Sequence, residues 1–143
     1  MKDYLNKQTY VNLQVSHQFI LVAFGVLEVK NSSYIHDQPS FIESFASILT
    51  IRDSEISNVE MDAINIRVIS SIFSITNMYI NNIRGPFNKN FIFIEFQCTF
   101  IAENITFTDS NSVLFTLLSS AVEIKQVKFK NNNNIPQFIK IQE

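Results

Sequence analysis

One short pattern recurs along the chain at nearly regular intervals, and it constrains the fold more than any other feature. Residues 74–82, SITNMYINN, alternate apolar with small polar residues and end in two asparagines. They fit a template with an apolar residue at position 0, an amide, acid or histidine at +2, an apolar residue at +5 and a second polar residue at +7. A chain that repeats one strand-like segment in this way indicates a repeat architecture.

Six segments match the template, and their starts lie 19, 22, 24, 27 and 22 residues apart. In the last five matches, the +2 and +7 residues define two polar columns. The first polar column comprises Asn31, Asp53, Asn77, Asn104 and Gln126. The second polar column comprises His36, Asn58, Asn82, Asp109 and Asn131. The earliest match places Asn12 and His17 at the same two positions.

Two further strand-like segments accompany the template. One precedes it directly, as in SILTI and SIFSI, and another follows it at residues 41–45, 64–68, 91–96, 113–117 and 138–141. These segments are rich in β-branched and aromatic residues, which strands favour, and INIRV and VLFTL alternate with a period of two. No segment shows a capped helical stripe. Two or three short strands in each repeat of about 22–24 residues are typical of a β-solenoid.

Stacking explains why the polar residue recurs. Coils stacked about 4.8 Å apart pair each strand with its equivalent in the next coil and bring the +2 residues into one file. Side-chain amides at that spacing hydrogen-bond along the file, as in an asparagine ladder. Asparagine also tolerates left-handed backbone, and the chain contains only two glycines, Gly25 and Gly85. We therefore expect the turns to use asparagine.

The rhythm of FSITNMYINN (residues 73–82) and its echoes resembles the right-handed parallel β-helix repeats of pectin-lyase-like proteins. It is most similar to the asparagine-rich repeats of large protist surface proteins and of bacterial polymorphic outer membrane proteins. The resemblance covers roughly residues 27–141, although Gly-Gly-Ala-type turns are missing. It implies an all-β, right-handed parallel β-helix solenoid of about five coils of 22–27 residues, and it favours a cell-surface or extracellular location.

Two other folds remain as alternatives. LTIRDSEI (residues 49–56) partly fits the pattern of a leucine-rich repeat, so a leucine-rich-repeat-like solenoid is the second choice. The fit fails in the other repeats, and no helical segment is available for the back of such a horseshoe. An antiparallel β-sandwich explains the short strands but leaves the recurring template unexplained.

Composition excludes several classes of protein. The 143 residues suit a single domain, 1–143, and the hydrophobic content of 46% argues against disorder. A net charge of −2 without a basic cluster argues against nucleic acid. The longest apolar run, FILVAFGVL (residues 19–27), is too short to cross a bilayer, so we expect a buried strand there and no transmembrane segment in this chain.

Pectin-lyase-like proteins include polysaccharide lyases and hydrolases, so the candidate catalytic groups need inspection. The acids are scattered; Glu60 and Asp62 share a parity in VEMDA and could flank a site, and Asp53 adjoins Arg52. With His17, His36 and one cysteine, Cys98, a zinc site is not expected, and Cys98 in FQCTF is interpreted as a buried apolar residue. The longest connection, RGPFNKN (residues 84–90), carries Phe87 among polar residues. We predict no catalytic, cofactor or metal site.

The sequence therefore predicts a non-catalytic structural or interaction module, a rigid scaffold or docking surface within a larger assembly. Neither terminal segment contains a capping element, and β-helix ends present unpaired strand edges. We expect the chain to be a segment of a longer protein or an assembly subunit, with other chains or flanking repeats as partners at its open ends. The alternative is a carbohydrate-active or carbohydrate-binding β-helix.

Overall fold

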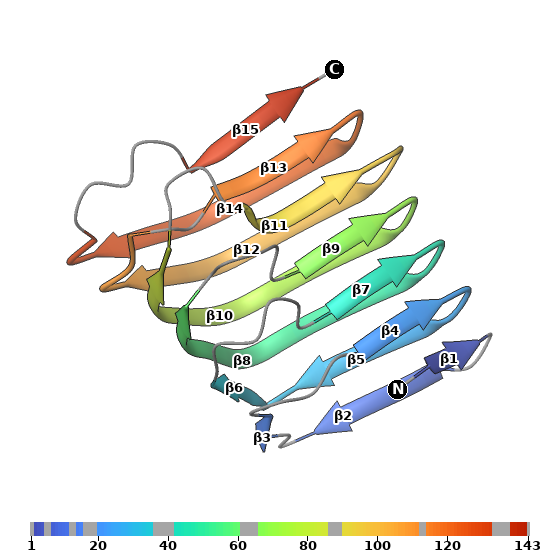
Figure 1. Cartoon of the computed structure of the whole chain (residues 1–143), viewed down its shortest axis with the longest axis horizontal. Coiled ribbons are helices and arrows are strands. Elements are labelled where there is room, and N and C mark those ends of the chain that lie inside the picture. Colours follow the sequence, from blue (N-terminus) through green and yellow to red (C-terminus); the bar gives the residue numbers. More distant parts are fainter. Residues whose placement is uncertain are drawn as a thin grey trace.

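The computed structural model describes residues 2–4, 7–11, 14–15, 20–35, 42–60, 66–85, 90–111, 114–132 and 138–142. These residues form fifteen β-strands and no helix. Every strand pair is parallel. Figure 1 shows two sheets whose strands are ordered from β1 and β2 at one end to β14 and β15 at the other.

Each coil contributes a short strand to one sheet and a longer strand to the other. The short-strand sheet contains β1 (Lys2–Tyr4), β4 (Ile20–Ala23), β7 (Ile42–Phe45), β9 (Ile66–Ile69), β11 (Asn90–Glu95), β13 (Leu114–Leu118) and β15 (Ile139–Gln142). The long-strand sheet contains β2 (Lys7–Val11), β5 (Val26–Lys30), β8 (Ile48–Glu60), β10 (Ile72–Arg84), β12 (Thr99–Thr108) and β14 (Ala121–Lys130), with β3 (Gln14–Val15) and β6 (Ser33–Ile35) beside them.

The register of the long-strand sheet matches the template. Ile75 of β10 lies opposite Ile51 of β8 on one side and opposite Ala102 of β12 on the other, and Ala102 in turn lies opposite Ile124. Equivalent residues in the sequence are therefore neighbours in space. The predicted parallel β-helix is confirmed, with a coil count roughly as expected. The leucine-rich-repeat alternative is wrong because the described residues contain no helix, and the antiparallel sandwich is wrong because all pairs are parallel.

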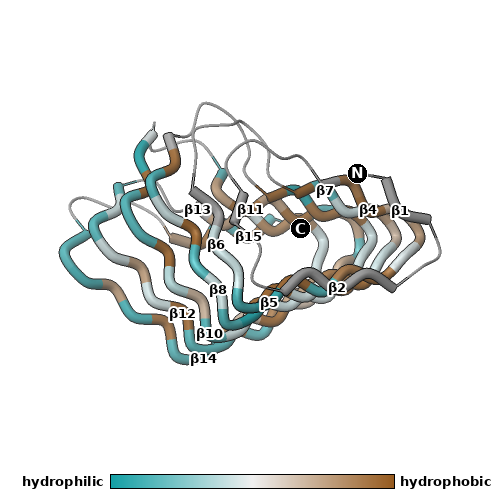
Figure 2. The backbone as a smooth tube through the Cα atoms, turned by 90° about the horizontal axis from the view of Figure 1, so that it is seen from below, coloured by the Kyte–Doolittle hydropathy of each residue, from teal (hydrophilic) through white to brown (hydrophobic). Residues whose placement is uncertain are grey.

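The core lies between the two sheets and consists of columns of apolar side chains, one from each coil. Leu27, Leu49, Phe73 and Phe100 form one such column, and each is at most 1% exposed. Figure 2 shows brown, hydrophobic residues recurring at the same place in successive coils. Burial of each such side chain contributes roughly 1.5–3 kcal/mol, and this is the main energy that stabilises the stack.

The chain turns at residues with left-handed backbone, and these form three columns. Two of them are the polar columns: Asn77 has φ 52° and Asn82 has φ 53°, and their described equivalents are similar. The third, the sharp-turn column, lies between the short and long strands. It comprises Phe24, Ala46, Ser70, Gln97 and Ser119, with φ values between 46° and 56°. Asparagine therefore serves as expected in two turns but not in the third, and neither glycine has a positive φ.

The apolar run at residues 19–27 corrects a second expectation. It is not a single buried strand, because the sharp turn at Phe24 and Gly25 divides it into β4 and the start of β5. Val22 and Leu27 are buried, whereas Phe24 is 52% exposed. Hydrophobicity alone could not reveal this turn, since a phenylalanine occupies its left-handed position.

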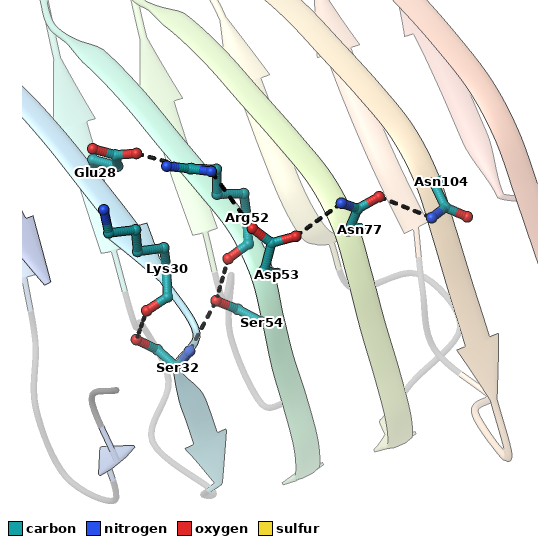
Figure 3. Close-up of polar contacts among 8 residues, drawn as sticks. All are labelled: Glu28, Lys30, Ser32, Arg52, Asp53, Ser54, Asn77 and Asn104. Atoms are coloured by element: carbon teal, nitrogen blue, oxygen red, sulfur yellow. Dashed lines mark hydrogen bonds and ion pairs between the residues drawn. The ribbon is translucent and has the colours of Figure 1, made fainter. Parts of the chain in front are cut away.

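Hydrogen bonds join the side chains of the first polar column across three coils (Figure 3). Asn77 Nδ2 donates to Asp53 Oδ1 at 2.8 Å, and Asn104 Nδ2 donates to Asn77 Oδ1 at 2.8 Å. In the second polar column, Asn82 Nδ2 donates to Asn58 Oδ1 at 2.8 Å. His36 lies outside the described residues. Each of these amides thus combines a left-handed turn with a hydrogen bond to the neighbouring coil.

We predict that Asn77→Leu lowers the free energy of unfolding by about 2–3 kcal/mol. Leucine in left-handed backbone costs roughly 1–2 kcal/mol, and the loss of two exposed hydrogen bonds adds about 1 kcal/mol. Asn77→Gly, which keeps the turn and removes only the hydrogen bonds, should cost less. Urea denaturation measures both, with Thr76→Leu in the adjacent strand position as the control. Equal losses for Asn77→Leu and Thr76→Leu would contradict the role of the column. The loop variant Asn88→Leu, expected from the sequence to cost little, lies outside the described residues.

Candidate functional site

Three of the described carboxylates, those of Glu28, Asp53 and Glu95, lie beside arginines. Arg52 Nε donates to Glu28 Oε1 at 2.9 Å, and its Nη1 lies 3.6 Å from Asp53 Oδ2 (Figure 3). On the other sheet, Arg67 Nη2 donates to Glu95 Oε1 at 2.6 Å, and Glu95 is buried. Within the described ranges, no three of histidine, cysteine, aspartate and glutamate gather to hold a metal ion. The Glu28–Arg52 and Arg67–Glu95 pairs each join adjacent coils within one sheet.

Several residues singled out in the sequence lie outside the described part of the chain. These are His17, His36, Asp62 and Phe87, together with the side chain of Glu60. The structure therefore leaves the Glu60–Asp62 pair and the Phe87 connection as predictions. It does place Asp53, whose carboxylate accepts a hydrogen bond from Asn77 and lies beside Arg52. Asp53 is thus part of a turn column and not of an acid cluster.

Cys98 is buried, as expected, and it has a structural role that the sequence did not suggest. Its Sγ accepts a hydrogen bond from the backbone N–H of Ser71 at 3.3 Å and donates to the carbonyl of Glu95 at 3.2 Å. The thiol is 2% exposed, and burial raises its pKa, so the reactive thiolate is disfavoured. Cys98 therefore acts as a small hydrogen-bonding residue at a corner of the coil.

The equivalent position is a serine at residues 47, 71 and 120 and a glycine at residue 25. The serines make a second set of contacts that sequence reasoning missed. Ser47 Oγ accepts from Gly25 N–H at 3.3 Å, and Ser71 Oγ accepts from Ser47 N–H at 3.0 Å. Each hydroxyl also donates to the carbonyl two residues earlier, Phe45 at 2.6 Å and Ile69 at 2.7 Å. The sequence does contain a matching pattern, in which a small residue is followed by a serine at each sharp turn: AS at residues 46–47 and SS at residues 70–71 and 119–120.

The other two turn columns use the same device. Ser54 Oγ accepts from Ser32 N–H at 3.1 Å, and Ser110 Oγ accepts from Ile83 N–H at 3.0 Å. Ser110 N–H in turn donates to Asn132 Oδ1 at 2.9 Å. In each case the backbone donor belongs to the earlier coil and the side-chain acceptor to the later one. Each coil is therefore completed by the coil that follows it.

The C-terminal coil, defined here as β14, β15 and Phe138, differs from the others in exposure. Phe129 of β14 is 45% exposed, although Phe107, opposite it in β12, is 0% exposed. Ile141 of β15 is 65% exposed, although Leu117, opposite it in β13, is 0% exposed. The same columns that form the core thus end in an uncovered apolar layer.

Both strands of the C-terminal coil also have one edge without a partner strand among the described residues, since they are the last members of their sheets. Phe138 covers this layer only in part. Its ring centroid lies 4.8 Å from that of Phe115 and 5.0 Å from that of Phe129. Unpaired backbone and exposed apolar side chains together form a template for a further strand.

A shallow groove lies along the sharp-turn column. Its lining includes Phe24, Val26, Ile48, Ile72 and Thr99, and no charged side chain of the described residues contributes to it. Phe24 packs edge to face against Phe45 with ring centroids 5.4 Å apart. Phe96, which is 62% exposed, precedes Gln97 in the sharp-turn column but does not line the groove. The groove combines apolar side chains with serine, threonine and glutamine, and its described lining residues include no acid pair of the kind that glycosidases use.

No protein-family model, no curated protein and no solved structure matches this chain. In the part of the chain that the structure describes, no helix has the length and apolar character needed to cross a membrane.

We predict that Ser71→Ala lowers the free energy of unfolding by about 1–3 kcal/mol, because the buried N–H of Ser47 loses its acceptor. Ser74→Ala is the matched control, since its hydroxyl makes a single side-chain contact, with Thr50 Oγ1 at 3.2 Å. Its cost should be well under that of Ser71→Ala in the same urea titration. If the two serines prove equivalent, the hydroxyls at the corners do not complete the backbone as described.

Proposed function

We propose that this protein is a non-catalytic β-helix scaffold that docks other protein chains or repeats through its C-terminal coil. The observation that carries the proposal is the uncovered end of the core, where Phe129 and Ile141 are exposed although their counterparts one coil below are buried. Because an unpaired strand edge accompanies this apolar layer, the end offers backbone hydrogen bonds as well as apolar contact.

The stiffness expected of a scaffold is supported by the contacts between coils. Each coil pairs two strands with its neighbours, buries its inward residues and exchanges side-chain hydrogen bonds at the corners. In this proposal, the amides of the first polar column act as an asparagine ladder that holds adjacent coils in register. Such stacking gives a rod, and in this proposal its uncovered C-terminal end carries the specific contacts.

A non-catalytic role is supported by the state of the carboxylates. Glu28 and Glu95 each form an ion pair with an arginine of the neighbouring coil, so these carboxylates are engaged in contacts that hold the coils together. The pectin-lyase-like resemblance remains a likeness of repeat pattern. Its enzymes would need paired carboxylates or a basic residue placed to abstract a proton, and the described residues offer neither arrangement at the groove.

Carbohydrate binding is the second candidate, and the groove along the sharp-turn column favours it. Phe24, Phe45 and Phe96 expose aromatic rings at this edge, and such rings can serve as platforms for sugars. Docking uses the C-terminal coil, whereas carbohydrate binding would use the groove along the sharp-turn column. They are therefore separable by experiments that report on position.

Hydrogen exchange tests the docking end. In the isolated chain, we expect the amides of β14 and β15 to exchange at least ~10-fold faster than those of β10 and β8, because edge strands open at lower free energy. β12 serves as the internal comparison, since it is covered by β14 on one side and β10 on the other. Protection of β14 equal to that of β10 would show that the end is already covered, which would overturn the proposal.

A screen of acidic and neutral polysaccharides tests the second candidate. We expect no new reducing ends and no unsaturated products. We also expect no change in binding between the wild-type chain and Phe24→Ser, which removes the exposed aromatic ring that lines the groove. Turnover of any polysaccharide would reverse our ranking, and binding lost in Phe24→Ser would assign the groove to carbohydrate.

A further inference from the structure

The hydrogen bonds at the corners define what can cover the C-terminal coil. Gly25 and Ser47 each donate their backbone N–H to a hydroxyl of the next coil, and Ser71 donates to the thiol of Cys98. Ser120 occupies the same corner in the last coil, and no described coil follows it to supply the acceptor. A helix or a flat apolar surface could not provide an acceptor at this corner together with a parallel strand edge. The geometry therefore calls for another β-coil.

Several of the longer polar side chains pair diagonally with the neighbouring coil, an arrangement called here the diagonal rule. Glu28 lies opposite Thr50 but pairs with Arg52, two residues further along the later strand. Arg67 lies opposite Phe93 but pairs with Glu95, again two residues further. Tyr79 lies opposite Thr106 and shares a hydrogen bond with Thr108. In these three contacts, a side chain of one coil reaches the residue two positions beyond its register partner in the next coil. Shorter side chains instead contact their register partners directly, as Ser74 does with Thr50.

The C-terminal coil presents lysines where the coil below presents threonines. Lys128 and Lys130 lie opposite Thr106 and Thr108, and Lys140 lies opposite Thr116. These three lysines are exposed, and none forms an ion pair with a described residue, whereas Lys125 pairs with Glu123. In a chain whose net charge is −2, the positive charge is thus concentrated at the uncovered end.

A second copy of this chain does not match that charge. In head-to-tail stacking, Lys2 of β1 would occupy the column of Lys140, because β1 and β15 lie at opposite ends of the same register. In tail-to-tail stacking, two ends with the same unpaired lysines would face each other. Like charges directly opposite one another destabilise strand pairing. The complementary partner is therefore an acidic coil, which a second copy supplies in neither orientation.

We propose, building on the docking function above, that the C-terminal coil binds a β-coil of another protein that carries a glutamate or aspartate opposite Lys130. By the diagonal rule, a carboxylate at that position lies beside Lys130 and within reach of Lys128. The covering coil pairs in parallel with β14 and β15 and places apolar side chains over Phe129 and Ile141. A serine, cysteine or asparagine at its sharp turn accepts the N–H of Ser120.

The test extends the full chain by one coil copied from its own residues 97–118, attached directly after Gln142 and carrying Cys98→Ser. In this added coil, the copy of Thr108 lies opposite Lys130. Three versions are compared: one keeps the threonine, one carries Thr108→Glu in the added coil, and one carries Thr108→Lys there. The measurement is the urea midpoint of unfolding together with hydrogen exchange of β14.

We expect all three extended chains to protect β14, and the midpoint to rise in the order Lys, Thr, Glu. The order should reverse when Lys128→Glu and Lys130→Glu are introduced together into the original coil. The differences between the three urea midpoints should also become smaller in about 1 M sodium chloride, where the screening length falls to about 3 Å. The reversal separates charge pairing from any general effect of glutamate on strand stability.

The outcomes distinguish this inference from the function on which it rests. Equal midpoints for the three versions, with β14 protected, would overturn the acidic partner and leave the docking end intact. No protection of β14 in any version would overturn both. Sedimentation of the unextended chain tests whether a second copy occupies the C-terminal coil. Concentration-dependent oligomers that disappear with Phe129→Asp would identify a second copy as the occupant and overturn the acidic partner.

Discussion

The structure depends on one constraint: a stacked coil can turn only where every neighbouring coil turns. Parallel strands of adjacent coils exchange backbone hydrogen bonds along their whole length, so a corner in one coil must coincide with a corner in the next. A single residue in left-handed backbone provides such a corner without breaking the pairing on either side. This conformation is unfavourable by roughly 1–2 kcal/mol for most residue types, and by less for asparagine and aspartate. Repetition in the sequence follows from repetition of the corner.

The corner also explains the small polar residue that follows it. Bending the strand turns one backbone N–H away from its strand partner, and a buried donor without an acceptor costs about 1–3 kcal/mol. The hydroxyls of Ser47, Ser54, Ser71 and Ser110 supply that acceptor from the next coil. Cys98 does the same with its sulfur, which is why a buried thiol is compatible with this position.

The sequence could predict the parts of the fold that depend on repetition. The period, the parallel strands and the alignment of Asp53, Asn77 and Asn104 all follow from a template visible in one chain. The sharp turn could not be predicted, because Phe24, Ala46 and Gln97 are not turn residues by propensity. Their left-handed backbone is imposed by the strands on either side, which gain more from pairing than the turn loses. Tertiary context decides such positions.

The sequence predicted that the functional surface lies at the ends of the solenoid, but it did not predict the charge of that surface. Open ends follow from any solenoid without a cap, but the sequence did not reveal that the last coil exchanges threonine for lysine at outward positions. That change is visible only once the register aligns Thr106 with Lys128 and Thr108 with Lys130. Lysine on an edge strand can discourage indiscriminate strand pairing, because a neutral or basic edge is not complementary to it. The same charge favours pairing with an acidic strand. The lysines therefore both disfavour neutral or basic strands and favour acidic ones at this end.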